Sequence, residues 1–349
     1  MRIFRTVGLL VLLAFALVFP LLFSNPEDTT IAVFTLIFGA SVVGWNILAG
    51  YTGYVALGHA AYFGIGAYAL ALICLHWNIV GGYGVFFLVP VAGLVAAVIS
   101  LPLGWIALRV RRHTFIVITI AMFFIVQLLS FNLGFTNGST GLSLPIPVDW
   151  GGDFFNTPFY YATLVVLLFS LALSWWVRNS KFGLGLLAIR DDEDRAMGLG
   201  VRTGVSKLVA FMLSALIVGM AGAIWGYFVE AVYPSSAFNP LFDISLALMG
   251  FLGGIGTIAG PLLGALILEP AQQYFTLQFG DSSAYLIIYG ALFLVILLLL
   301  PRGILPTLQE RWNKYLASRG EQSTQREPVP ALAADPRPAD GERKEGINL

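Results

Sequence analysis

Six consecutive charged residues, 190–195, interrupt an otherwise apolar chain in the stretch LAIRDDEDRAMGLG. Acidic side chains in the first turn of a helix complement the positive end of its dipole, and glycine suits the C-terminal cap. We therefore expect a short helix that starts within 191–194 and stops at Gly198 or Gly200. One face of that helix would contain Glu193, Ala196, Met197 and Gly200. Such a nearly smooth face, edged by charge, suits docking into a groove of another protein, and a purely solvated connection is the alternative.

Catalytic chemistry has little support in the sequence. The three histidines, His59, His76 and His113, are scattered, and Cys74 is the single cysteine. Neither a nucleophile with a neighbouring base nor a cluster of metal ligands is apparent. The chain also lacks a G-x-x-x-x-G-K-[ST] phosphate-binding loop. We therefore expect no enzyme activity, no cofactor, no metal site and no nucleic-acid partner.

The composition indicates a membrane protein. Hydrophobic residues make up 58% of the 349 residues, charged residues 11%, and the mean hydropathy is +0.84. Nine apolar runs are long enough to cross a bilayer core of about 30 Å as helices. They lie at 7–23, 30–48, 56–75, 83–108, 115–131, 159–177, 208–227, 244–268 and 284–300. We expect an all-α, polytopic membrane protein with about 8–10 transmembrane or re-entrant helices, the first run being an uncleaved span.

Basic residues set the expected orientation. They form four groups: Arg2 with Arg5, 109–112, 178–207, and Arg302 with the tail. The connections 24–29, 76–84, 134–157 and 230–243 contain neither Lys nor Arg. Because positive residues concentrate in cytoplasmic loops, we expect the four basic groups and both termini to be cytoplasmic.

One apolar run must depart from a plain crossing. Two simple crossings after 228–243 would place Arg302 on the wrong face. We therefore expect the run 244–268 to break at Gly253, Gly254 and Gly256 and to re-enter, and a kinked crossing is the alternative. Irregular backbone at membrane depth occurs only where it is buried in protein or lines a wet cavity, so these glycines are candidates for a pathway.

A second glycine-rich stretch is NILAGYTGYVALGHAAYFGIGAYALAL, residues 46–72. Gly50, Thr52 and Gly53 suggest a helix break, and a helix that starts inside the membrane exposes N–H groups suited to gating or to a substrate carboxylate. A tightly packed interior helix after a flexible turn is the alternative. His59 is also a pathway candidate, although a hydrogen-bonded packing role is the simpler interpretation.

Three further features complete the pattern. Small residues recur at helical spacing in 56–71 and again in 215–226, which favours close packing of both helices against protein. Glu230, Asp243 and Glu269 lie near the expected span ends, where solvated positions are expected. We expect a membrane domain at 1–305, an amphipathic interfacial helix at 306–320 and a disordered, charged tail at 321–349.

The charged stretch carries a resemblance. AIRDDEDRAMGLGV resembles the cytoplasmic coupling loop of ABC-transporter permeases, whose pattern is Glu-x-Ala-Ala-x-x-x-Gly followed by Ile or Val. Arg195 replaces the first alanine of that pattern. The resemblance implies a coupling loop at about 186–205. The residues that it would assign to ATPase coupling are Arg190, Asp191, Glu193, Ala196, Gly200 and Val201.

The wider chain resembles the LivM-type permeases of branched-chain amino acid ABC transporters. The motifs, in order, are LAGYTGYVALGHAAYFGIGAYALAL, TNGSTGL, GFLGGIGTIAGPLLGALIL and LLLLPRGIL. The resemblance implies a type II importer permease in a bacterial inner membrane. Its implied partners are a homologous second permease as a heterodimer, two ATPase subunits and a periplasmic binding protein. Related permeases serve urea or short amides, and an ion-coupled secondary transporter is the alternative from another class.

Overall fold

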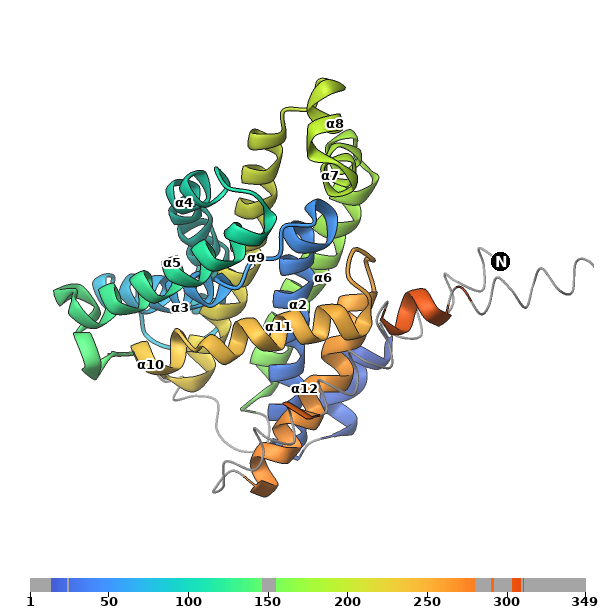
Figure 1. The fold of residues 1–349 in the computed structure, drawn as a ribbon. Coiled ribbons are helices and arrows are strands. Elements are labelled where there is room, and N and C mark those ends of the chain that lie inside the picture. Colours follow the sequence, from blue (N-terminus) through green and yellow to red (C-terminus); the bar gives the residue numbers. More distant parts are fainter. Residues whose placement is uncertain are drawn as a thin grey trace, which may run out of the picture. The chain divides into compact units, whose positions relative to one another are not determined.

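The computed structural model describes residues 14–23, 25–145, 155–279, 290–291, 303–308 and 310. The chain divides into two compact units, Met1–Thr307 and Leu308–Leu349, and all elements named below belong to the first. Residues 14–22 form a helix. The further elements (Figure 1) are α2 (Pro26–Thr52), α3 (His59–His76), η1 (Tyr83–Leu88), α4 (Val89–Ala107), α5 (Arg112–Asn132), η2 (Gly134–Thr136), η3 (Gly138–Thr140), β1 (Leu142–Ser143), α6 (Thr157–Asn179), α7 (Lys181–Asp191), α8 (Glu193–Gly198), α9 (Thr203–Val229), β2 (Ala231–Val232), α10 (Pro234–Ala237), α11 (Pro240–Gly253) and α12 (Gly260–Phe279).

The predicted all-α membrane architecture is confirmed. Seven helical segments within the described residues are long and apolar enough to cross a membrane. Residues 7–13 of the expected span 7–23, most of the run 284–300, most of the interfacial helix and the tail lie outside the described residues.

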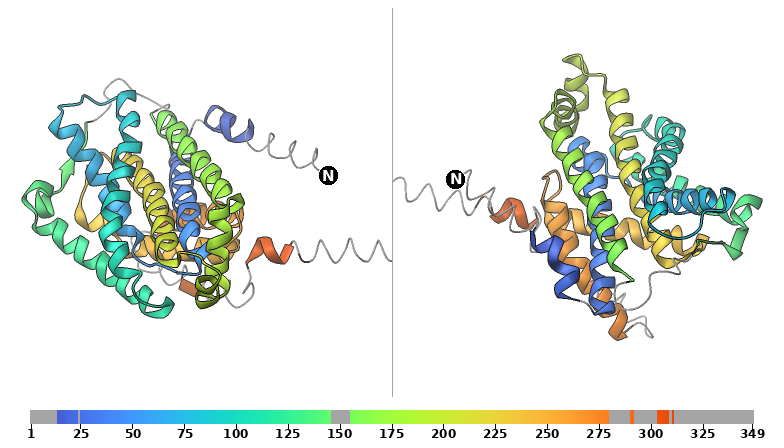
Figure 2. Two further views of the ribbon diagram at one scale, coloured as in Figure 1. Left: turned by 90° about the horizontal axis from the view of Figure 1, so that it is seen from above. Right: turned by 180° about the vertical axis from the view of Figure 1, so that it is seen from behind.

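Helix α9 lies between α2 on one side and α3 with α4 on the other (Figure 2). Glycines make this packing possible. A Cβ on Gly66 of α3 would lie 2.0 Å from the Gly219 carbonyl oxygen of α9, and one on Gly222 would lie 2.0 Å from that of Phe63. The prediction that both small-residue stretches pack against protein is therefore confirmed.

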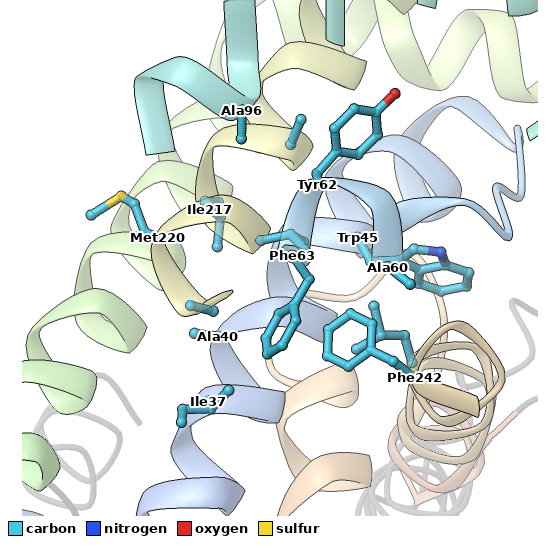
Figure 3. Packing of buried hydrophobic residues seen from close by; sticks show 14 of the residues in the cluster. Ile37, Ala40, Trp45, Ala60, Tyr62, Phe63, Ala96, Ile217, Met220 and Phe242 are labelled. Atoms are coloured by element: carbon cyan, nitrogen blue, oxygen red, sulfur yellow. The ribbon is translucent and has the colours of Figure 1, made fainter. Parts of the chain in front are cut away.

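The buried core joins α2, α3, α9 and α11. Figure 3 shows Phe63 of α3 beside Phe242 of α11, with Ala40 and Ile37 of α2 to the left of Phe63. The ring centroids of Phe63 and Phe242 are 4.3 Å apart, and those of Phe38 and Phe242 are 5.1 Å apart. This aromatic cluster brings α11 against the first two long helices.

The predicted break in the run 244–268 is present. Helix α11 ends at Gly253, and Gly254 and Gly256 have φ angles of +118° and +82°, which L-residues with a Cβ rarely adopt. Helix α12 then packs back on α11, since a Cβ on Gly264 would lie 1.8 Å from the Met249 carbonyl oxygen. The glycines thus form the tip of a close helical hairpin.

The connections without basic residues meet at one end of the unit. Strand β1 pairs antiparallel with β2, with Leu142 opposite Val232. The side chain of Asn156 donates to the hydroxyls of Thr29 and Thr30. These contacts bring the segment before α2, the connection from α5 to α6 and the connection from α9 to α11 together, as expected if they share one membrane face.

Candidate functional site

The basic segments between the helices converge at the other end of the unit. Residues 108–113, between α4 and α5, line a cavity together with 191–194 of the α7–α8 segment and Lys207 of α9. Arg111 and Asp194 form an exposed ion pair of 3.6 Å across this cavity. The two central basic groups of the sequence therefore occupy one region, as the orientation prediction requires.

The predicted short helix exists as α8, with differences at its start. Asp192 is the N-cap, and its carboxylate accepts a hydrogen bond of 3.0 Å from the Arg195 amide. Gly200 has a φ of +86°, so it ends the segment as expected. Asp191 does not belong to α8, because it ends α7, a helix that the sequence prediction missed. Ser180 caps α7 by accepting from the Gly183 amide.

The expected docking face of α8 is oriented differently from the prediction. Ala196 is buried, and Glu193 turns toward α9, while Met197 and Leu199 are exposed. The reason is an interior partner for Glu193: Lys207 Nζ lies 2.5 Å from its Oε1, and the Tyr54 hydroxyl donates to its Oε2. Glu193 and Ala196 therefore hold α8 on the unit, and the exposed surface belongs to Met197 and Leu199.

This ion pair is well shielded from water. The Lys207 side chain is 5% exposed and that of Glu193 24% exposed. Burial raises the pKa of Glu193, but the hydrogen bonds from Lys207 and Tyr54 outweigh that penalty, so its pKa lies below the ordinary value. Glu193 is consequently charged at neutral pH and neutralises the buried ammonium.

Arginine side chains connect the charged segment to the helix breaks. Arg190 Nη1 donates to the carbonyl oxygen of Gly50 at 2.9 Å. Gly50 lies in the last turn of α2, where carbonyls have no partner within the helix and α2 has no basic residue of its own. Arg112 in turn donates to the carbonyls of Ile189 and Arg190, at 2.8 and 2.6 Å, and so binds the C-terminus of α7.

The tip of the α11–α12 hairpin joins the same network. Arg178 Nη1 donates to the Gly256 carbonyl at 2.9 Å. Asn46 of α2 binds the tip on both sides, accepting from the Gly256 amide and donating to the Thr257 carbonyl, each at 2.8 Å. A Cβ on Gly50 would lie 2.0 Å from the Asn46 amide oxygen, so glycine is required there. The structure thus unites Gly50 and Gly256 with Arg190, although they are far apart in sequence.

The remaining candidates near the first break have local roles. Gly53 caps α2 with a φ of +73° and lies against Arg190, with its Cβ position 3.3 Å from Arg190 Cγ. Thr52 is buried, and its hydroxyl donates to Leu48 and accepts from the Tyr54 amide, closing the turn. At the second break, a Cβ on Gly253 would lie 1.7 Å from the Gly260 carbonyl oxygen, while Gly254 follows it at the tip.

His59 and Asp243 form a separate buried site at the start of α3. The His59 ring Nε2 is 2.7 Å from the Ser214 hydroxyl of α9, so the predicted hydrogen-bonded packing is observed. The Asp243 carboxylate accepts from the amides of His59 and Ala60, at 2.7 and 3.2 Å. The expectation of free N–H groups at this helix start is therefore wrong, because α11 supplies a carboxylate that complements the helix dipole.

The expected positions of two carboxylates are also wrong. Asp243 and Glu269 were expected at solvated span ends, yet both are buried within the unit. The hairpin of α11 and α12 packs against α2 and α3, which removes these carboxylates from the surface. Sequence reasoning also missed Lys207, Arg112, Arg178 and Asn46. Lys207 and Arg178 gave a signal, because each is a cation directly at the end of an apolar run.

Metal chemistry has no site in the part of the chain that is described. No group of three or more His, Cys, Asp and Glu side chains there could hold a metal ion. Arg112, Arg178 and Arg190 form a cluster whose role is mechanical. Its charge-assisted hydrogen bonds link the α7–α8 segment to the end of α2, and α6 to the hairpin tip.

Comparisons with known proteins agree with the resemblance. Residues 29–297 match the family described as branched-chain amino acid transport system, permease component. The chain is 28% identical over 342 residues to the high-affinity branched-chain amino acid permease protein LivM of Escherichia coli K12, covering 90% of this chain and 78% of LivM. It is 26% identical over 281 residues to LivH of the same organism, covering 75% of this chain and 89% of LivH.

A third relative broadens the group. The autoinducer 2 import system permease protein LsrC of Yersinia pseudotuberculosis is 29% identical over 138 residues, covering 37% of this chain and 39% of LsrC. No solved structure matches the chain. The homologues are transport permeases rather than enzymes. The family match covers most of the sequence, and the chain therefore belongs to the permease components of branched-chain amino acid transport systems.

Proposed function

We propose that this chain is one of two permease subunits of an ATP-driven importer in a bacterial inner membrane. It pairs with a homologous permease, while two ATPase subunits bind the cytoplasmic face and a periplasmic binding protein delivers the substrate. The names of the relatives LivM and LivH support such a pair of permeases. Hydrophobic, branched-chain amino acids are the proposed substrates.

The observation that carries the coupling role is the position of α8. Leu199, directly after α8, is 82% exposed, and Met197 beside it is 56% exposed. An exposed apolar side chain in such a loop suits burial against a partner, here the ATPase. Arg190, just before α8, binds the last turn of α2. A movement of α8 is therefore transmitted through Arg190 to the helix break after α2. This chain needs no nucleotide site of its own for that step.

The opposite end suits the binding protein. The β1–β2 pair and the connections without basic residues gather there. With that end periplasmic, the basic cluster and both termini are cytoplasmic by the positive-inside rule. The α11–α12 hairpin then acts as a re-entrant element, and the pathway runs beside Gly50, Thr52, Gly53, His59, Gly253, Gly254 and Gly256.

Capture of the ATPase tests this assignment. In cells that co-express all subunits, Leu199→Asp should insert and pair with the second permease but retain little tagged ATPase. Val80→Asp is the matched control, because Val80 is 84% exposed on a connection at the opposite end. Equal ATPase recovery from both variants would remove α8 from the docking surface.

A further inference from the structure

A cavity of about 410 Å³ lies beside the aromatic cluster of the core. Phe38, Phe63 and Phe242 contribute an apolar wall, and Glu269, Gln272 and Gln273 of α12 contribute a polar wall. Its size falls within the range of about 300–1,000 Å³ that is usual for small-molecule sites, and an apolar lining with a few polar groups is typical of them.

Glu269 has one carboxylate oxygen without a partner among the described residues. Its Oε1 accepts a hydrogen bond of 2.8 Å from Gln273 Nε2. Its Oε2 is buried and has no hydrogen-bond partner within the described residues. A buried polar atom left unpaired costs free energy in either protonation state, and ionisable residues inside membrane domains commonly mark substrate pathways. The carboxylate is therefore poised for a partner that the described residues do not supply.

The chemistry of the two walls selects that partner. A carboxylate oxygen binds an ammonium group. The aromatic wall suits an apolar side chain of the same ligand, and its ring faces also attract the ammonium group. The amides of Gln272 and Asn239 also line the cavity and are able to donate to a substrate carboxylate. A small amino acid with an apolar side chain matches all three features, whereas urea or a short amide lacks the ammonium group.

We propose that the cavity between α11, α12 and the Phe63–Phe242 wall binds the transported amino acid, with its ammonium group on Glu269. This inference rests on the proposed import of hydrophobic amino acids. Glu269 is fully buried, so a ligand reaches its carboxylate only after a side chain of the cavity wall moves. Entry therefore requires a rearrangement of the cavity wall, to which both α11 and α12 contribute side chains.

The first test is Glu269→Gln in the complete transporter with its partner subunits, reconstituted in proteoliposomes. The amide keeps the shape of the side chain and removes its charge. Uptake of radiolabelled leucine should fall about tenfold or more, because a hydrogen bond to a charged group is lost. Glu230→Gln, outside the cavity, is the control and should remain close to wild type. Normal leucine uptake by Glu269→Gln would overturn the inference, while absence of leucine uptake by the wild type would refute the proposed function itself.

A labelling experiment covers the case in which Glu269→Gln does not assemble. Thr276 lines the cavity and is exposed, and its hydroxyl donates to the Gln272 carbonyl. In a Cys74→Ala background of the complex, leucine at about ten times its half-saturating concentration should slow N-ethylmaleimide labelling of Thr276→Cys about tenfold. Thr140→Cys, an exposed threonine with a similar local hydrogen bond, should be unaffected.

The deaminated analogue 4-methylpentanoate separates ammonium recognition from simple apolar binding. It should leave the labelling of Thr276→Cys unchanged. Equal protection by leucine and by this acid would contradict the role of Glu269, and no protection by leucine would exclude the cavity as the binding site.

Discussion

Replacing Glu193 by Gln tests how α8 is held on the membrane unit. The change leaves the Lys207 ammonium, which is 5% exposed, without its counter-ion at 2.5 Å. Removing one partner of a buried ion pair costs about 3–5 kcal/mol of stability. The helix dipole alone would account for only about 0.3–1 kcal/mol. We therefore expect the purified permease to lose several degrees of thermal stability and α8 to become sensitive to protease.

Two comparisons isolate the pair. Asp194→Asn removes an ion pair whose side chains are 88% and 72% exposed, so it should cost about 0–1 kcal/mol. Adding Lys207→Met to Glu193→Gln removes the uncompensated charge and should recover much of the loss, which a double-mutant cycle measures as a coupling free energy. Thermal unfolding of five proteins, monitored by tryptophan fluorescence, gives these values: the wild type, Asp194→Asn, Glu193→Gln, Lys207→Met and the double variant. The reasoning is refuted if Glu193→Gln is no more destabilising than Asp194→Asn.

Three further predictions concern pH, packing and topology. Because folding lowers the pKa of Glu193, this residue contributes its full stabilisation above the unfolded pKa of about 4.3 and loses it as pH falls through the folded pKa. The difference in stability between the wild type and Glu193→Gln should therefore be equal at pH 7 and pH 5. A difference that becomes smaller at pH 5 contradicts the assignment. Gly222→Val should prevent accumulation of folded permease, because its Cβ would lie 2.0 Å from the Phe63 carbonyl oxygen. Gly198→Ala has open space around it and should accumulate normally on immunoblots. Similar yields of the two variants would argue against the α3–α9 contact. In a Cys74→Ala background, an impermeant thiol reagent should label Ser139→Cys but not Leu199→Cys in intact cells, and the reverse result would invert the orientation.

Local sequence rules predicted the elements that depend on neighbouring residues. The break at Gly253–Gly256 followed from the number of crossings that the positive-inside rule allows and from the conformational freedom of glycine, and the structure contains it. Helix α8 followed from its acidic start and its glycine stop. The close packing of α3 and of α9 against protein followed from small residues at helical spacing, whereas their pairing with each other is a finding of the structure. Apart from the orientation argument, which uses basic residues along the whole chain, each of these signals lies within one short stretch of sequence.

Contacts between distant residues could not be predicted in the same way. Arg190 binds Gly50, and Asp243 binds the amide of His59, across 140 and 184 positions of sequence. Proximity to a run boundary suggested that Asp243 and Glu269 are solvated, but the folding of α11 and α12 into a hairpin buries both. The inward turn of Glu193 likewise depends on Lys207 and Tyr54, which the periodicity of the α8 segment does not contain.

The most direct measurement is the number of substrate molecules transported per ATP hydrolysed by the Arg190→Ala transporter. Arg190 of α7 donates to Gly50, so its loss should break this link between the α7–α8 segment and the last turn of α2 while leaving the exposed Met197 and Leu199 surface in place. The reconstituted complex should keep hydrolysis stimulated by loaded binding protein, and transport per ATP should fall about tenfold. Arg202→Ala, an exposed arginine at the N-cap of α9, should keep the wild-type ratio. An unchanged ratio for Arg190→Ala would contradict transmission of the ATPase movement through this residue.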